Sequence, residues 1–220
     1  MNLQSLKLIV CGTDTDVGKT IVSSFLVQGL TAVYWKPIQS GYEDGGDSHT
    51  VQQLLNLPPE RILPERYKFK AAVSPHWAAE QENQLVESQN LKIPMIKEPL
   101  VIETAGGVMV PLTREYLQID QLRKWMLPVL LVARTGLGTL NHTLLTIEAL
   151  KKRNIPIIGI ILNGPFHRDN PKTLQEISGI DIVAQLPLME QISSEVLSMQ
   201  WREQKVSEKL EKLIHHTNNC

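Results

Sequence analysis

The chain has 220 residues, 42% of them hydrophobic, and its 22 basic and 23 acidic residues almost cancel. This length predicts one domain over residues 1–220 with a sizeable core. The balanced charge gives no electrostatic reason to expect binding to nucleic acid or to a membrane surface. No apolar stretch approaches the ~18 residues of a membrane span and the first residues lack a signal-peptide pattern, so a cytoplasmic location is expected. The two cysteines, Cys11 and Cys220, predict neither a disulfide framework nor a metal site.

The first predicted element is a strand over residues 6–11, followed by the run Gly-Thr-Asp-Thr-Asp-Val-Gly-Lys-Thr at 12–20 and a helical pattern. A strand, a turn that ends in Gly-Lys-Thr and a helix form a phosphate-binding P-loop. The unpaired N–H groups of the first helical turn point at the anion. Lys19 is expected at the β- and γ-phosphates and Thr20 on Mg²⁺. A chance Gly-Lys-Thr is the alternative, and the flanking strand and helix weigh against it.

The next predicted strand covers residues 33–36 and leads into Lys-Pro-Ile-Gln-Ser-Gly at 36–41. A lysine that closes a buried strand beside a phosphate loop is costly unless an anion meets it. A side chain that extends its charged end to solvent is the alternative. Asp47 follows a glycine turn, where it either binds a metal or caps a helix. The proline-rich stretch from Pro58 to Pro99 is expected to be a long excursion with one or two short helices over the active-site edge.

Four further strands are predicted over residues 100–103, 129–133, 157–162 and 182–184. They are continuous Val/Ile/Leu runs, which is typical of strands buried on both faces. Helical spacing appears over 140–150, with Thr139 as a candidate N-cap, and again over 206–213. Strands that alternate with helices predict an α/β fold, a single P-loop domain with a mostly parallel sheet and helices on both faces.

Polar or glycine-rich residues follow several of these strands, where ligands of open α/β sheets gather. Glu103 begins the run Glu-Thr-Ala-Gly-Gly, and with Asp47 and Thr20 it would complete an oxygen shell for Mg²⁺. Each acid also has an interpretation without a metal: Asp47 could cap a helix, and Glu103 could be a residue of a surface turn. The run Gly-Thr-Leu-Asn-His at 138–142 brings a helix N-terminus to the same edge, either as a carboxylate site or as an ordinary capped connection.

Together these segments resemble dethiobiotin synthetase, and the resemblance covers essentially the whole chain. The most specific segments are 12–20, 36–41, 103–107 and 138–142. The P-loop is one residue longer than usual, as is typical of that family. Asp16 stands where the family usually has Glu. No acidic residue matches the one that often touches the nucleotide sugar, since Ser194 falls near that place.

The resemblance implies an ATP- and Mg²⁺-dependent ring closure, in which diaminopelargonate and CO₂ give dethiobiotin through a carbamate and a carbamic-phosphoric anhydride. It also implies a homodimer, in which Leu140 and Asn141 of the neighbouring subunit meet the substrate carboxylate. Lys36 and Lys19 would be catalytic, Ser40 and Thr15 would contact the substrate, and Thr20, Asp47 and Glu103 would hold Mg²⁺. The implied nucleotide site comprises Asp16, Val17, Gly18, Lys19, Thr20, Ile21, Asp47, Glu103, Thr104, Ala105, Gly106, Asn163, Gly164, Pro187, Leu188 and Met189.

Three other functions compete with this interpretation. An ATPase of the partitioning or metal-carrier type has the same sheet architecture, but that class carries an extra lysine at the position of Asp14. A ligase linked to an amidotransferase needs a glutaminase domain, for which 220 residues leave no room. A nucleotide-dependent regulatory module needs no second ligand beside the phosphate site, and Lys36, Ser40 and Asp47 indicate one.

Overall fold

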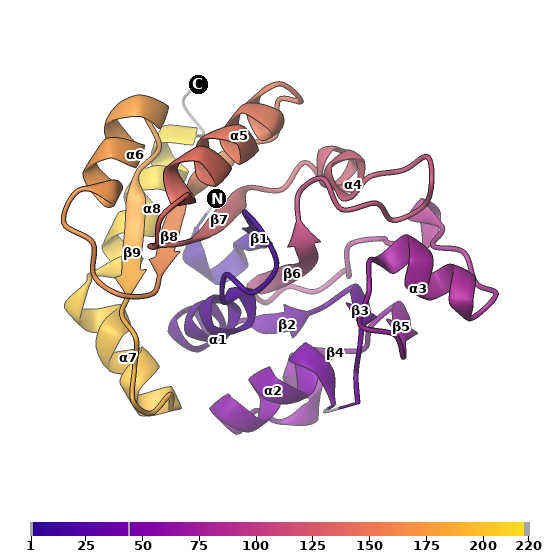
Figure 1. Ribbon diagram of the computed structural model, residues 1–220. Coiled ribbons are helices and arrows are strands. Elements are labelled where there is room, and N and C mark those ends of the chain that lie inside the picture. Colours follow the sequence, from indigo (N-terminus) through magenta and orange to yellow (C-terminus); the bar gives the residue numbers. More distant parts are fainter. Residues whose placement is uncertain (1, 44, 218–220) are drawn as a thin grey trace.

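The computed structural model describes residues 2–43 and 45–217, so Cys220 lies outside the described part. Seven parallel strands form one sheet in the order β4-β2-β6-β1-β7-β8-β9 (Figure 1). The predicted α/β P-loop fold with a parallel sheet is therefore confirmed. The strands are β1 (Lys7–Gly12), β2 (Val33–Trp35), β4 (Ile62–Leu63), β6 (Leu100–Gly107), β7 (Val129–Arg134), β8 (Ile157–Asn163) and β9 (Ile182–Leu186).

Helices cover both faces of this sheet because its strands are apolar on both faces. One face packs against α1, α2, α7 and α8, and the other against α4, α5 and α6 (Figure 1). The helices on the first face are α1 (Lys19–Leu30), α2 (Gly46–Leu55), α7 (Ser194–Glu203) and α8 (Val206–Thr217). Those on the second face are α4 (Gln118–Trp125), α5 (Thr139–Lys151) and α6 (Asn170–Ser178).

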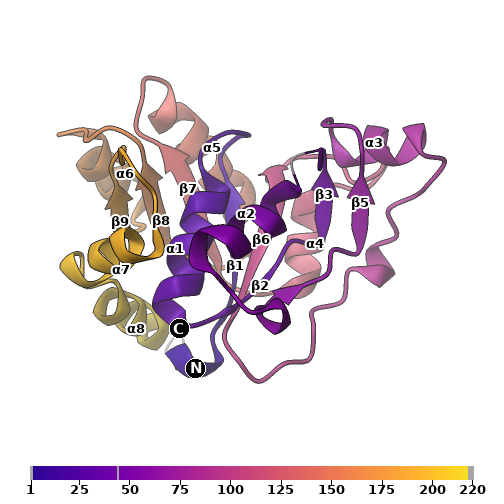
Figure 2. The same cartoon turned by 90° about the horizontal axis from the view of Figure 1, so that it is seen from below.

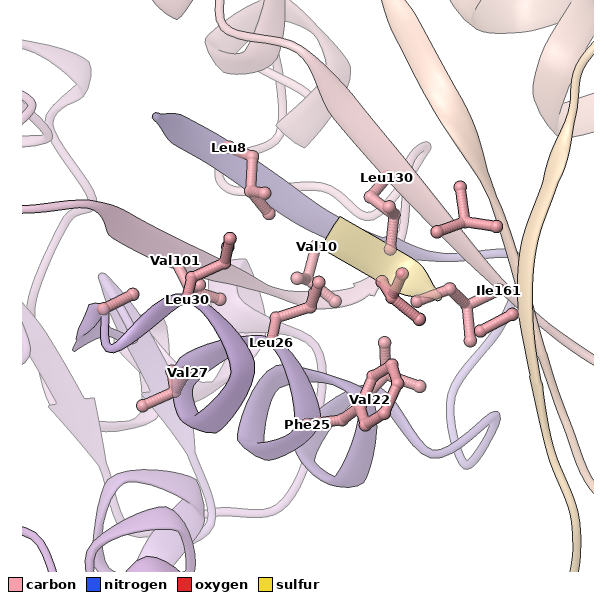
Figure 3. Close-up of a cluster of buried hydrophobic side chains, with 14 of the residues drawn as sticks. Leu8, Val10, Val22, Phe25, Leu26, Val27, Leu30, Val101, Leu130 and Ile161 are labelled. Atoms are coloured by element: carbon pink, nitrogen blue, oxygen red, sulfur yellow. The ribbon is translucent and has the colours of Figure 1, made fainter. Parts of the chain in front are cut away.

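Helix α1 anchors the P-loop to the largest apolar cluster of the molecule. Its side chains Val22, Phe25 and Leu26 are fully buried against the sheet (Figure 3). On the strand side they meet Val10 and Val101 among others. Because α1 starts directly after the loop, this packing holds the first turn of the helix, and with it the loop, at the carboxyl end of β1.

A small second layer lies at one side of the molecule (Figure 2). It contains the two-stranded parallel sheet of β3 (Ile38–Ser40) and β5 (Tyr67–Phe69) together with α3 (Pro75–Gln81). Single 3-10 turns cover Leu3–Ser5, Pro59–Arg61 and Ser88–Asn90. A separate apolar cluster, which includes Phe69 and Leu91, supports this layer. Within the described residues, no helix is long and apolar enough to cross a membrane.

The structure contains the predicted strands, but it differs from the prediction in the strand ends, in the excursion over 58–99 and in the N-cap of α5. All six predicted strands form: five start at the predicted residue, and the last residue of each strand differs from the predicted one by one to four positions. The excursion over 58–99 contains strands β4 and β5 as well as the expected short helix. The sequence does not predict these two strands, because neither β4 nor β5 lies in a continuous run of Val, Ile and Leu long enough to indicate a strand. Thr139 is not an N-cap: Gly138, at φ 91°, takes that position, and the Thr139 hydroxyl donates to the carbonyl of Arg134 at 2.5 Å.

Candidate active site

The P-loop lies between β1 and α1 and leads directly into the first turn of the helix. Gly18 is the N-cap of α1 with φ 85°, and no side chain caps the helix there. The first N–H groups of α1 are thus left for an anion. A Cβ atom at Gly18 would collide with the amide of Asn163, so only glycine fits. That amide donates from Nδ2 to the carbonyl of Val17 at 3.1 Å, which fastens the loop to the end of β8.

Lys19 is held under the loop instead of extending into solvent. It is 7% exposed, and its Nζ donates to the carbonyl of Asp14 at 3.0 Å. Burial, and then the nearby charge of Lys36, lower the pKa of the Lys19 ammonium below its usual value. An incoming polyphosphate would offset both effects, since it supplies negative charge at the same place.

Four side chains from different elements meet at the carboxyl ends of the central strands, and we call them the cation cluster: Thr20, Lys36, Asp47 and Glu103. The Thr20 hydroxyl lies 3.0 Å from both Asp47 Oδ1 and Glu103 Oε1. The Lys36 Nζ lies 2.6 Å from Asp47 Oδ2 and 3.0 Å from Glu103 Oε1. The predicted grouping of Thr20, Asp47 and Glu103 is therefore present in the structure.

Lys36 is 4% exposed and does not reach solvent, so the interpretation as a solvated lysine is wrong. Its ammonium also donates to the carbonyl of Thr104 at 3.1 Å, which gives it three oxygen partners. Burial alone would lower the pKa of Lys36, but the charges of Glu103 and Asp47 raise it above its usual value. The lysine is therefore a fixed positive charge at neutral pH.

The two carboxylates of the cation cluster are themselves held in place. Asp47 lies in the first turn of α2, whose N-cap is Gly45, so it is not the cap of its helix. Its backbone N–H donates to Gln39 Oε1 at 3.1 Å. Burial disfavours the charged form of Asp47, yet Lys36 lowers the pKa of this carboxyl below its usual value. Glu103 is 1% exposed and accepts a hydrogen bond at Oε2 from the hydroxyl of Tyr34 at 3.0 Å.

A cavity of about 560 Å³ opens beside the P-loop and the cation cluster. Ser40 Oγ is buried and has no hydrogen-bond partner among the described residues, so a polar ligand is expected there. Seven residues of the lining were not predicted from the sequence. Among these seven, only Ser74-Pro75 has a recognisable local pattern, because serine followed by proline is typical of the start of a helix. The lining comprises Thr15, Asp16, Gly18, Lys19, Thr20, Lys36, Ile38, Gln39, Ser40, Asp47, Ala72, Val73, Ser74, Pro75, Glu103, Ala105, Gly106 and Val110.

Other predicted site residues lie outside this lining. Val17 and Thr104 are buried and do not line the cavity, and the Thr104 hydroxyl donates to the carbonyl of Val10 at 3.2 Å. Ile21 packs against the core on α1. The segment from Pro187 to Met189 follows β9, and Leu188 is 75% exposed. Leu140 and Asn141 begin helix α5, while Asn163 and Gly164 lie at the end of β8.

The donor set of the cation cluster suits Mg²⁺. Magnesium in proteins takes oxygen ligands, and it is usually held by one or two carboxylates together with water and substrate phosphates. Thr20, Asp47 and Glu103 offer one hydroxyl and two carboxylates, and both carboxylates contact that hydroxyl. Within residues 2–43 and 45–217, no group of three or more His, Cys, Asp or Glu side chains is arranged so that it could bind a metal ion.

The fold is similar to that of solved structures of other proteins. One is the septum site-determining protein MinD with Mg-ADP from Pyrococcus horikoshii, with a TM-score of 0.59 and 16% identity over 95% of each chain. A second is a ParA family ATPase from Chlorobium tepidum, with a TM-score of 0.55 and 12% identity, covering 97% of this chain and 99% of that one. At these identities the similarity shows the fold alone.

Curated relatives are much closer in sequence. The family described as AAA domain matches residues 7–196. An ATP-dependent dethiobiotin synthetase BioD of Afipia carboxidovorans is 46% identical over 88% of this chain and 92% of its own length. A protein of the same name from Rhodopseudomonas palustris is 45% identical over 88% of this chain and 91% of that one. With a P-loop fold and identities of this size along most of both chains, the chain is an enzyme that belongs to the ATP-dependent dethiobiotin synthetase family.

Proposed function

We propose that this enzyme uses ATP to join CO₂ to the vicinal diamine diaminopelargonate, giving dethiobiotin, ADP and phosphate. The observation that carries the proposal is the buried Lys36, which faces a cavity next to the P-loop. A phosphate loop alone needs only Lys19. Lys36 already pairs with Asp47 and Glu103, and a carbamate that enters the cavity would be a further anion for this second ammonium.

The chain's own residues fit Mg²⁺ on the ATP side of the site. Thr20, Asp47 and Glu103 would hold the ion, and the Thr20 hydroxyl already lies 3.0 Å from an oxygen of each carboxylate. The ion that these residues would hold would neutralise part of the negative charge of the nucleotide phosphates.

The reaction begins when one amine of the diamine adds to CO₂ and loses a proton, which gives a carbamate. A carbamate oxygen then attacks the γ-phosphorus, ADP leaves, and a carbamic-phosphoric anhydride forms. The second amine attacks the carbamate carbon and expels phosphate, which closes the cyclic urea.

Lys19 and Lys36 supply the positive charge that these steps require. Two anions must approach each other in the phosphoryl transfer, and fixed ammonium groups stabilise the charge that develops between them. Lys19 would contact the β- and γ-phosphates and Lys36 the carbamate. Because Lys36 is held by three oxygens, it needs little reorganisation during the reaction. Its raised pKa keeps the charge in place and argues against a role as a nucleophile.

Ser40 and Thr15 would orient the diamine and its carbamate. Both line the cavity, and the buried hydroxyl of Ser40 has no partner among the described residues. A hydroxyl in this state is ready to bond with an amine or a carbamate oxygen. Holding the carbamate in line with the γ-phosphate also removes part of the entropic barrier.

The nucleotide base would lie beyond the P-loop, near the ends of β8 and β9. Asn163 is the last residue of β8 and Gly164 follows it. The segment Pro187, Leu188 and Met189 follows β9. Backbone along Asp16 to Ile21 and along Glu103 to Gly106 would meet the phosphates and the junction with the second substrate. Ser194 begins α7, and no acidic residue for a ribose contact is proposed there.

The proposal includes a homodimer with shared sites, in the cytoplasm. Leu140 and Asn141 do not line the cavity of their own chain. They would instead reach the cavity of the neighbouring subunit, where they would meet the carboxylate at the end of the substrate. A helix N-terminus suits a carboxylate, and the N-cap of α5 is Gly138, which offers no side-chain cap. Leu137 beside it is fully exposed, as expected of an interface residue. Asn141→Ala should raise KM for the diamine, and an active monomer in sedimentation would contradict the shared site.

The test of the whole proposal is a search for dethiobiotin by mass spectrometry after incubation with ATP, Mg²⁺, bicarbonate and diaminopelargonate. Phosphate release is measured in parallel with and without the diamine. We expect diamine-dependent release in the native enzyme and almost none in Lys36→Gln, with ATP binding retained. Lys36→Arg should also be poor, because its planar fork replaces a compact ammonium. Release at the same rate without diamine in both proteins would indicate an ordinary ATPase and overturn the proposal.

A further inference from the structure

The two oxygens of the Glu103 carboxylate have separate partners. Oε1 lies 3.0 Å from the ammonium of Lys36 and 3.0 Å from the hydroxyl of Thr20. Oε2 instead accepts a hydrogen bond of 3.0 Å from the hydroxyl of Tyr34. The carboxylate is therefore divided between the cation cluster on one side and a buried phenol on the other.

The sheet places Tyr34 so that its hydroxyl meets Glu103. Strands β2 and β6 are parallel neighbours, and Tyr34 is in register with Val101. Glu103 follows Val101 by two residues, so the side chains of Val101 and Glu103 lie on the same face of β6. Tyr34, which is paired with Val101, points to that same face of the sheet. Tyr34 and Val101 belong to the same buried cluster, which fixes that face. The tyrosine is 0% exposed, and its ring is surrounded by apolar side chains.

We infer that Tyr34 is a positioning residue for the metal: it holds Glu103 Oε2 so that Oε1 stays directed at the cation cluster. The inference rests on the proposed binding of Mg²⁺ by Thr20, Asp47 and Glu103. A hydrogen bond to the second oxygen of a ligating carboxylate fixes its orientation, and loss of such a partner typically costs ~10–100-fold in metal affinity or activity. Tyr34 touches no substrate in this scheme and acts only through Glu103.

The alternative is that Tyr34 only fills space in the core. Phenylalanine keeps the ring and its packing and removes one oxygen atom, so Tyr34→Phe separates the two roles. A matched control is Tyr67→Phe, whose lost hydroxyl accepts hydrogen bonds from Glu87 N at 2.9 Å and Asn90 Nδ2 at 3.1 Å, outside the cavity lining.

The readout is binding of Mn²⁺ in the presence of ADP, followed by electron paramagnetic resonance of the free ion, with folding checked by thermal melting. Tyr34→Phe should bind Mn²⁺ ~10-fold more weakly than the native enzyme, and Tyr67→Phe should bind it equally well. In steady-state assays KM for Mg²⁺ should rise by a similar factor in Tyr34→Phe, while kcat at saturating Mg²⁺ changes much less.

Two further variants separate this inference from the proposed metal site itself. Glu103→Gln and Thr20→Val should each weaken Mn²⁺ binding. If they do and folded Tyr34→Phe binds Mn²⁺ like the native enzyme, the role of Tyr34 is refuted and the metal site stands. If neither weakens binding, the metal site is refuted, and the role of Tyr34 with it.

A measurement on the native chain covers the case in which Tyr34→Phe does not fold. The chain has four tyrosines, so 3-fluorotyrosine gives four fluorine resonances, and Phe substitution at the other three positions assigns Tyr34. Addition of Mg²⁺ with ADP should shift the Tyr34 resonance, because the charge on its acceptor changes. A Tyr34 resonance that stays unmoved while nucleotide binding saturates would overturn the inference.

Discussion

Replacing Lys36 by glutamine removes the ammonium that lies between Asp47 and Glu103. The two carboxylates then face each other and the Thr20 hydroxyl without a neutralising charge. The side chains of Lys36 and Glu103 are 5% and 1% exposed, and that of Asp47 is 30% exposed. Water therefore screens the Asp47 side of this cluster better than the Glu103 side.

Removing one partner of a buried ion pair typically costs ~3–5 kcal/mol, because an uncompensated charge remains buried. The partial exposure of Asp47 favours the lower end, so we expect Lys36→Gln to lose about 3 kcal/mol of unfolding free energy without metal or nucleotide. For a chain of this size, 1 kcal/mol shifts the melting temperature by roughly 2–4 °C. The expected drop is therefore roughly 6–12 °C.

The assay is thermal melting of native enzyme and variant, with and without Mg²⁺ and ADP. Metal and nucleotide should stabilise Lys36→Gln more than the native enzyme, because the metal supplies the positive charge that the variant lacks. Lys172→Gln is the control, since it breaks the exposed ion pair with Glu176 at 3.7 Å and should leave the melting temperature unchanged. A melting temperature of Lys36→Gln equal to that of the native enzyme, without metal, would refute the buried position of this ammonium.

Three further predictions concern the same site. Lys19→Ala and Thr20→Val should each lower kcat ~10²-fold or more, measured as ADP formation, and full activity in either would contradict the P-loop assignment. Because the pKa of Asp47 is lowered in the folded state, its stabilisation is present above its usual pKa of 3.8 and is lost as the pH falls through the folded value. Asp47→Asn should therefore flatten the acid limb of a melting-temperature profile, and an unchanged limb would exclude this carboxylate as its source. Gly18→Ala should weaken ADP binding in calorimetry and lower the melting temperature, because its Cβ collides with Asn163 at a positive φ; native-like binding would show that the loop has another conformation.

The local parts of this protein follow from its sequence because short-range rules determine them. Glycine, lysine and threonine at 12–20 between a strand and a helix predict the P-loop, and the left-handed Gly18 fulfils the backbone requirement of that pattern. Continuous apolar runs predict buried parallel strands, and all of those form. The longer strands were predicted well, because each holds enough apolar residues to show a pattern.

The predicted site residues divide in a similar way. A charged residue next to a buried strand or a glycine turn indicates a functional role, and this pattern predicts Lys36, Asp47 and Glu103 as site residues. The distances of 2.6 Å and 3.0 Å from the Lys36 ammonium to the two carboxylates do not follow from the sequence. They depend on the order of β2, β6 and β1 in the sheet, which packing of distant segments decides.

Residues with an ordinary local pattern were missed altogether. Tyr34 reads as one more apolar residue of a buried strand, and only the register of β2 against β6 brings its hydroxyl to Glu103. The cavity wall at Ala72 to Pro75 belongs to a proline-rich excursion whose strands are two or three residues long. The sequence by itself determined the P-loop, the buried strands and the charged candidates Lys36, Asp47 and Glu103, since backbone propensity and burial act locally. Only the tertiary structure decided which of them touch, because contacts between residues far apart in the chain depend on the packing of the whole sheet.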